Sequence, residues 1–468
     1  MSMHFPPGFH FGVATSAYQI EGAADEDGRG PSMWDTFCSV PGAVTHGDTG
    51  AIACDHYHRT DEDMDLAAGL GLTAYRFSVG WPRIVPDGTG SVNQKGLDYY
   101  RRLVDGLRAR GVEPMATLYH WDLPQPLQDA GGWVNRDTVA HFCDYVQLVL
   151  DSLGDVVPVW VTMNEPFCSG MIGHLQARHA PGVADLHSAL AASHHLLLAH
   201  GLAMGMIRDR APQARAGITH LLSDIHAASD SGADQAAARR LDGYENRWFL
   251  DAVLRGSYPA DMLDWYQRQV PLDFIRDGDM EIMAAPADFM GVNYYETKRV
   301  AGDPDEPFHQ ARVIPAAHYL DAAELTANGI DARPAGLGRI LRRVHEVTPL
   351  PLYITENGAA YHDYVDPEGG VDDVERVAYL TAHFGETLAA IRAGVDVRGY
   401  FVWSLLDNFE WADGYSRRFG LVWVDFGTQA RIPKASARWY AQLITDQPAQ
   451  LITDQPAQLF ADQPAQRP

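Results

Sequence analysis

Eight short apolar runs, separated by longer amphipathic stretches, recur along this chain of 468 residues. The stretches between the runs repeat apolar residues at spacings of three and four, a pattern that is typical of helices. The expected strands are residues 9–14, 74–79, 113–118, 159–163, 216–221, 289–292, 352–355 and 399–403. This alternation predicts an α/β fold, a single (β/α)₈ TIM barrel with long loops after its strands.

The helical pattern is clear in residues 96–110, where the apolar side chains form one stripe. The other expected helices are residues 135–153, 186–211, 335–346, 371–393 and a last run that follows Pro433 to residue 444. We expect Asp137 near the start of one helix and Gly394 at the end of another. A doubly wound sheet is the alternative fold, but no glycine-rich phosphate loop opens a helix after the first strand, which weakens its nucleotide-binding version.

At about 150 residues per domain, the length alone suggests about three domains. However, no Pro/Ser-rich linker interrupts residues 1–444, so we predict one barrel domain there. Residues 445–468 repeat an eight-residue unit marked by Pro448, Pro456 and Pro464. Proline at that period excludes a continuous helix, and we expect this tail to be disordered.

The chain carries 36 basic and 61 acidic residues, a formal net charge of −25. A chain this acidic is a poor candidate for binding nucleic acid or an anionic membrane. We expect no membrane span, because no segment offers 18 apolar residues without charges, and the N-terminus has no signal-peptide pattern. The four cysteines form no C-x-x-C pair, which gives no support for a zinc or redox site. We therefore expect a cytoplasmic protein without metal or cofactor, either a monomer or a homo-oligomer.

In a barrel of this type the reactive groups lie just beyond the carboxyl ends of the strands. Polar, acidic and aromatic residues gather there: Gln19, Arg76, His120, Trp121, Asn164, Glu165, Asn293, Tyr295, Glu356, Trp403, Glu410 and Trp411. Glu165 and Glu356 each directly follow an apolar strand, and the fourth and seventh strands face one another across a barrel. Paired carboxylates of this kind are what cleavage of a glycosidic bond requires. Either motif alone could be a helix cap or a plain loop.

Five segments together give the chain a strong resemblance to a known family. These are residues 9–22, 162–166, 354–358, 408–411 and 434–440, which span nearly the whole chain outside the tail. The chain resembles glycoside hydrolase family 1, of the β-glucosidase type. The resemblance implies a (β/α)₈ fold and retaining hydrolysis of β-D-glucosides, such as cellobiose, short oligosaccharides and aryl glucosides. A transglycosylase that uses the same pair, and a preference for galactosides or fucosides, stay open as alternatives.

The resemblance also implies roles for the catalytic residues. Glu356 would be the nucleophile, held ionised by Arg76 and the Tyr295 hydroxyl, and Glu165 would be the general acid and then the general base. Asn164 would bind the sugar 2-hydroxyl, and Asn293 belongs to the same catalytic group. Retention predicts that the two carboxyl groups lie roughly 5–5.5 Å apart.

Further residues would bind the sugar. Gln19, His120 and Glu410 would bind hydroxyls, Trp403 would form a stacking floor and Trp411 would donate its indole N–H. Trp121 and Phe419 complete the predicted substrate-binding set. Because the Glu410 carboxylate would repel a phosphate, we expect unphosphorylated sugars.

Three positions depart from the family pattern on the leaving-group side, namely Phe167, His174 and Ile330. Ile330 stands where the family usually places an aromatic platform, which predicts weaker stacking with the aglycone. The histidines outside the motifs, such as His56, His58, His194 and His195, lack metal-ligand spacing and are interpreted as packing residues.

Overall fold

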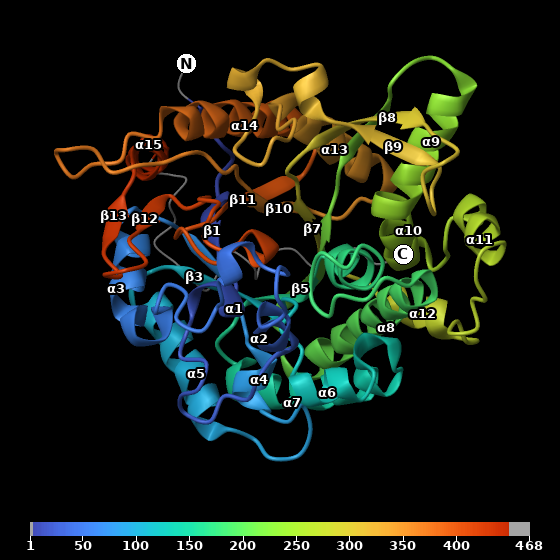
Figure 1. The fold of residues 1–468 in the computed structure, drawn as a ribbon. Helices are drawn as coiled ribbons and strands as arrows, with labels where there is room; N and C mark the ends of the chain where they lie inside the picture. Colours follow the sequence, from blue (N-terminus) through green and yellow to red (C-terminus); the bar gives the residue numbers. More distant parts are fainter. Residues whose placement is uncertain (1–2, 449–468) are drawn as a thin grey trace.

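The computed structural model describes residues 3–448, and eight parallel strands close into a barrel (Figure 1). The barrel strands are β1 (His10–Ala14), β2 (Ala74–Ser78), β3 (Glu113–Tyr119), β4 (Val159–Asn164), β5 (Arg215–Leu221), β7 (Phe289–Asn293), β10 (Leu352–Asn357) and β11 (Val397–Trp403). Each pairs with the next barrel strand along the chain, and β11 pairs with β1 to close the ring. The predicted TIM barrel is confirmed, and the doubly wound alternative is wrong.

The eight barrel strands are buried along nearly their whole length, and their side chains alternate between two cores. In β4, Val159 and Val161 belong to a cluster inside the barrel, whereas Trp160 packs outward against the helices. In β11, Phe401 and Trp403 point to the interior cluster and Tyr400 points outward. Period-2 alternation between two apolar environments explains why these strands appear in the sequence as continuous apolar runs.

The helices surround the barrel (Figure 1). The predicted helices are confirmed as α5 (Gln94–Ala109), α7 (Asp137–Leu153), α8 (Leu186–Arg210), α13 (Pro334–Val347), α14 (Val374–Arg392) and α15 (Ala435–Thr445). The other helices are α1 (Ala17–Ile20), α2 (Met33–Cys38), α3 (His56–Gly69), α4 (Trp81–Ile84), α6 (Gln125–Asp129), α9 (Gly232–Asp242), α10 (Trp248–Arg255), α11 (Ala260–Gln267) and α12 (Asp279–Met283). Asp137 lies in the first turn of α7, and Gly394 follows the last turn of α14 with a φ of 99°, both as expected.

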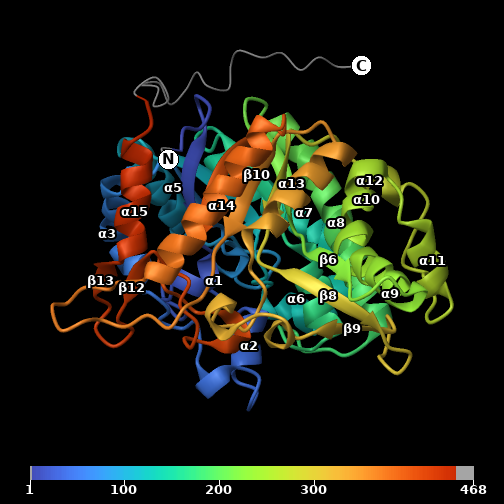
Figure 2. The same cartoon turned by 90° about the horizontal axis from the view of Figure 1, so that it is seen from above.

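The loops after the strands are long and carry further structure that the sequence patterns did not predict. A small sheet of β6 (Asp224–Ala227), β8 (Thr297–Gly302) and β9 (Ala311–Ile314) lies outside the barrel. A hairpin joins β12 (Val422–Val424) to β13 (Arg431–Pro433). Figure 2 shows α2 and the β8–β9 pair on the side of the barrel away from the N-terminus. Two π-helical segments, η3 (Cys168–Ile172) and η4 (Gly243–Arg247), precede helical segments of the β4 and β5 loops.

The two ends of the described chain are joined. Gln447 is buried, accepts a hydrogen bond from the Phe5 N–H at 3.1 Å and donates one to the Met3 carbonyl at 2.9 Å. The described chain therefore makes contacts beyond residue 444, and the division of the chain at that residue stays a prediction. The tail prediction for residues 449–468 lies outside the described residues.

Helix α8 is the one described helix that meets the length and composition of a membrane span, which the sequence did not lead us to expect. It is long and apolar enough to span a membrane by length and composition, because its arginines and its aspartate all lie at its end, in residues 208–210. Most of that stretch, 83%, is buried inside the protein, where α8 packs against α7, α12 and η3. Its composition therefore fits a core helix of the barrel.

Candidate active site

The predicted catalytic side chains converge at the carboxyl ends of the barrel strands. Arg76 comes from β2, Asn164 ends β4, Asn293 ends β7 and Glu356 lies near the end of β10. Glu165 directly follows β4, and Tyr295 lies two residues beyond β7. All are buried except Tyr295, which is half-buried.

Glu356 is held by two donors. The Arg76 guanidinium donates to its Oε1 at 2.6 Å, and the Tyr295 hydroxyl donates to its Oε2 at 2.7 Å. Arg76 is itself fixed, because its Nε–H donates to the Thr117 hydroxyl at 3.1 Å. Burial raises the pKa of the Glu356 carboxyl, while the Arg76 charge and the Tyr295 hydrogen bond oppose that rise.

Glu165 sits in a less favourable setting for a negative charge. Its Oε1 accepts a hydrogen bond from the Asn293 amide at 2.6 Å, and its Oε2 accepts one from the Cys168 thiol at 3.0 Å. Its backbone has a φ of 46°, and its N–H donates to the Thr219 carbonyl at 2.9 Å. Burial and then the negative charge of Glu356 raise the pKa of Glu165 to about 8.

A continuous hydrogen-bond network links the two carboxyl groups. The side-chain oxygen of Asn164, Oδ1, accepts hydrogen bonds from Arg76 at 2.6 Å and from the Asn293 amide at 3.2 Å. The Asn293 amide also donates to Glu165. The Thr355 hydroxyl donates to the Asn293 carbonyl oxygen at 2.7 Å, which fixes that amide's orientation. Because the guanidinium contacts Glu356 and only neutral donors contact Glu165, the first proton taken up by the pair belongs on Glu165.

The predicted sugar-binding residues lie beside this network. His120 accepts a hydrogen bond from the Asn164 amide at 3.0 Å, and burial lowers its pKa well below the usual value, so the ring is neutral. Its other ring nitrogen, Nδ1, is buried and has no partner among the described residues. The Glu410 Oε2 atom is likewise buried without a partner, and burial raises the pKa of Glu410 to about 8. These two atoms are available to bind hydroxyl groups.

Gln19 is already engaged by the protein. Its amide donates to the Phe409 carbonyl at 2.8 Å and to Asn408 at 3.1 Å, while its carbonyl oxygen accepts from the Ser16 hydroxyl at 2.6 Å. One lone pair of that oxygen is the remaining capacity of the Gln19 side chain for a hydroxyl.

The aromatic residues form a connected group around His120. The rings of Trp403 and Trp411 both stack on the His120 ring, each at 6.0 Å between centroids. The Trp121 ring lies against the Trp411 ring, with 4.5 Å between centroids, and its indole N–H donates to the backbone carbonyl of Asn164 at 2.9 Å. Trp121 therefore supports Asn164 and has no indole N–H left for a sugar. Phe419 meets the Tyr295 ring edge-on at 6.2 Å.

The three departures from the family pattern differ in their surroundings. Phe167 packs edge-on against Tyr244 and Phe249, and the His174 ring binds the Ser169 carbonyl at 2.8 Å. Both are buried, whereas Ile330 is partly buried at the edge of the core. The weaker aglycone stacking expected from Ile330 stays a prediction.

Sequence reasoning missed the residues that support the reacting groups. Thr117 and Thr355 orient Arg76 and Asn293, and Cys168 contacts Glu165 directly. The threonines lie in barrel strands and resemble ordinary β-formers, so no pattern marks them. Cys168 lies three residues after Glu165, a spacing at which side chains meet in a helical turn, and that signal was available.

Of the histidines outside the motifs, His56, His194 and His195 are buried packing residues, as predicted. His56 binds Asp63 at 2.8 Å, and His195 binds the Trp133 carbonyl at 2.9 Å. His194 lies between Tyr258 and Asp279. His58 differs in being exposed, where it binds Asp55 and Glu26.

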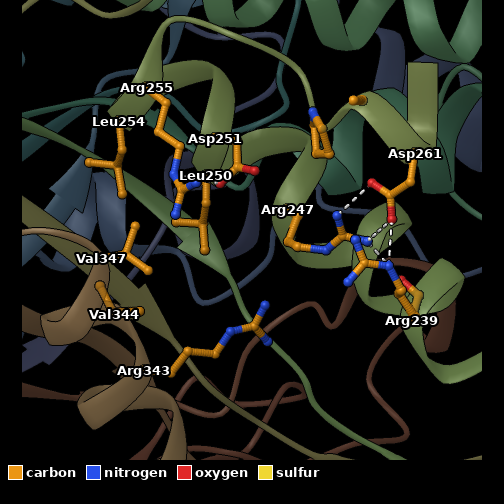
Figure 3. Close-up of a pocket in the computed structure, with 12 residues that line it drawn as sticks. Arg239, Arg247, Leu250, Asp251, Leu254, Arg255, Asp261, Arg343, Val344 and Val347 are labelled. Atoms are coloured by element: carbon orange, nitrogen blue, oxygen red, sulfur yellow. Dashed lines mark hydrogen bonds and ion pairs between the residues drawn. The ribbon is translucent and has the colours of Figure 1, made fainter. Parts of the chain in front are cut away.

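A separate cavity of about 360 Å³ lies among the outer helices (Figure 3). Four arginines line it, but each faces an aspartate. Arg247 pairs with Asp261 at 2.8 Å, as the dashed lines in Figure 3 show. The other pairs are Arg239–Asp261, Arg255–Asp251 and Arg343–Asp242. Its charges are thus largely neutralised internally, and it contains neither Glu165 nor Glu356, so it is not the catalytic site.

Comparisons with known proteins agree with this geometry. The family model described as "Glycosyl hydrolase family 1" matches residues 1–448. β-Glucosidase A of Thermotoga maritima is 45% identical over 442 residues, which cover 94% of this chain and 97% of that protein. The crystal structure of the GH1 β-glucosidase from Exiguobacterium antarcticum B7 matches with a TM-score of 0.92 and 43% identity, over 95% of this chain and 100% of that one. The family 1 β-glucosidase of Thermotoga maritima in complex with isofagomine lactam matches with a TM-score of 0.91 and 44% identity, over 95% and 99% of the two chains.

Proposed function

Because this chain belongs to glycosyl hydrolase family 1, we propose that it hydrolyses β-D-glucosides with retention of the anomeric configuration. One observation carries the mechanism: two buried glutamates share a hydrogen-bond network, but only Glu356 contacts a cation. Glu356 is therefore the carboxylate of the pair, and Glu165 is the carboxylic acid.

In the first step Glu356 attacks the anomeric carbon of the glucoside. The Glu165 proton passes to the glycosidic oxygen, and the bond between that oxygen and the anomeric carbon breaks. The product is an ester between Glu356 and the sugar. Arg76 and Tyr295 hold the attacking carboxylate ionised and aimed before the reaction.

In the second step Glu165 changes its role. The ester removes the negative charge from Glu356, and that charge is the second cause of the raised pKa of Glu165. The pKa of Glu165 therefore falls in the intermediate, so the carboxylate can accept a proton from water as the water attacks the ester. Glucose leaves and both glutamates return to their starting states.

The substrate we propose is an unphosphorylated β-glucoside, with cellobiose and short oligosaccharides as natural examples. Glu410 supports this choice, because its buried Oε2 atom can accept a hydrogen bond from a sugar hydroxyl, whereas a fully ionised phosphate has no proton to donate. We also propose a cytoplasmic location, which is supported by the four cysteines, all of them free in the described residues.

Paired variants test the assignment on aryl β-glucosides. Glu356→Gly should lose turnover by several orders of magnitude, because the nucleophile is absent. Glu165→Ala should still release a good leaving group in a burst and then stall, because the base for the second step is missing. Near-normal turnover of Glu356→Gly, or no burst with Glu165→Ala, would show that these roles are wrong.

A further inference from the structure

Cys168 is tied to Glu165 at two points. Its backbone N–H donates to the Glu165 carbonyl at 2.9 Å, and its thiol contacts the Glu165 Oε2 atom at 3.0 Å. Cys168 is the first residue of the π-helical segment η3, and its side chain is buried. Among the described residues the thiol has no other hydrogen-bond partner. π-Helical turns are frequent at functional sites, and this one directs a thiol at the reacting carboxyl.

We propose that Cys168 is a positioning residue for catalysis, whose thiol donates a hydrogen bond to Oε2 of Glu165 and stabilises the ionised form of that carboxyl. The inference rests on the proposed function, in which Glu165 is the acid and then the base. It adds a donor that neither the motifs nor the comparisons single out.

The two carboxyl oxygens of Glu165 are served by different residues. Asn293 donates to Oε1 at 2.6 Å and also holds Asn164, so its replacement would disturb the whole network. Cys168 donates only to Oε2, so its replacement changes Glu165 alone. The charged and titratable groups that face this pair are Glu356, Arg76, Tyr295, Glu410, Arg178 and Tyr244.

The Cys168 thiol is protonated near neutral pH. Burial, and then the charge of Glu165, raise the pKa of Cys168 well above its usual value. It is therefore a donor whenever Glu165 is ionised. A hydrogen bond to the charged form lowers the pKa of a carboxyl, and here it opposes the rise caused by burial and by Glu356.

The two steps of the reaction need opposite protonation states of Glu165, and the Cys168 thiol favours the second of them. Burial favours the protonated form that the first step needs, but the second step needs the ionised form. A thiol is a weak donor, so it favours ionisation without making Glu165 a carboxylate at the start of the cycle.

The test compares Cys168→Ala, which removes the donor, with Cys168→Ser, which keeps one. Cys143→Ala on α7 is the matched control for loss of a cysteine away from the site. The measurement is kcat/KM against pH for phenyl β-glucoside, whose poor leaving group needs the Glu165 proton. Cys168→Ala should move the basic limb to higher pH by about 0.5–1 unit. Cys143→Ala should leave the limb in place, and Cys168→Ser, whose hydroxyl is the stronger donor, should leave it in place or move it to lower pH.

Equal basic limbs in the unaltered protein and Cys168→Ala would overturn the proposal. So would equal shifts in the Ala and Ser variants, which would indicate a packing effect. A basic limb that persists in Glu165→Gln would instead overturn the acid role of Glu165, and thereby the proposed function.

Infrared spectroscopy gives a readout that does not depend on activity. The S–H stretching band lost in the Cys168 variants should lie at the low frequency of a hydrogen-bonded thiol, and it should rise in Glu165→Gln, whose amide oxygen accepts more weakly. If the Ala variant does not fold, the Ser variant assigns the band. An unchanged frequency in Glu165→Gln would contradict the hydrogen bond.

Discussion

Glu165 and Glu356 are chemically identical side chains, and their surroundings alone give them different roles. Both are buried and neutral donors contact each of them, but the Arg76 charge lies on Glu356 only. The residues that make this difference could be predicted because Arg76 lies in an apolar strand, Asn293 ends one and Tyr295 follows it. The contacts themselves could not, since strand ends that meet in a closed barrel are distant in sequence.

Replacement of Tyr295 tests the electrostatic setting of Glu356. The Tyr295 hydroxyl hydrogen bond lowers the pKa of Glu356, so Tyr295→Phe should raise it. The acidic limb of kcat/KM reports ionisation of the nucleophile and should move to higher pH by roughly 0.5–1 unit. Tyr364→Phe, at a side chain that is 73% exposed, is the matched control and should not move the limb. A limb that stays in place in Tyr295→Phe would show that the hydroxyl does not stabilise the carboxylate.

At the scale of elements, the predicted strands lie within two residues of the observed ones. The barrel strands were predictable because each is buried between two apolar layers, which requires a continuous apolar run. The small sheet was not predictable, because β8 (TKRVAG) and β9 (ARVI) are half-exposed and carry charged residues. Such short strands depend on pairing with one another and not on their own composition.

The end of α14 offers a matched pair of glycines. Gly394 adopts a φ of 99° just beyond the helix, whereas Gly385 lies inside it, and an added methyl group would meet open space at both. Gly394→Ala should lower the free energy of unfolding by about 1 kcal/mol, because alanine resists positive φ. Gly385→Ala should raise it by about 0.5–1 kcal/mol, because alanine favours the helix. Urea denaturation measures both, and shifts of the same sign would contradict the account.

At the scale of the whole molecule, the C-terminal end of the described chain is hydrogen-bonded to its N-terminal end. Gln447 joins Phe5 and Met3 across 442 and 444 positions of sequence. The repeat pattern placed Gln447 in the predicted tail. Its contacts could not be predicted, because a proline-marked repeat does not indicate which residues are hydrogen-bonded.

The contribution of Gln447 can be measured in a chain that ends at Pro448. Gln447→Ala should lower the free energy of unfolding by about 1–3 kcal/mol, because the buried Phe5 N–H loses its partner. Gln442→Ala, at an exposed side chain of α15, should change it by less than about 0.5 kcal/mol. Equal effects of the two substitutions would show that the Gln447 hydrogen bonds to Phe5 and Met3 do not stabilise the fold.

In the proposed function, the Glu165–Glu356 pair cleaves β-glucosides by double displacement. Proton NMR of the first turnover of an aryl β-glucoside, recorded before mutarotation equilibrates the product, reports this directly. Two successive inversions at the anomeric carbon predict that β-glucose appears first, followed by slow conversion to the α-anomer. Initial formation of α-glucose would mean a single displacement by water, and would contradict the role of Glu356 as nucleophile.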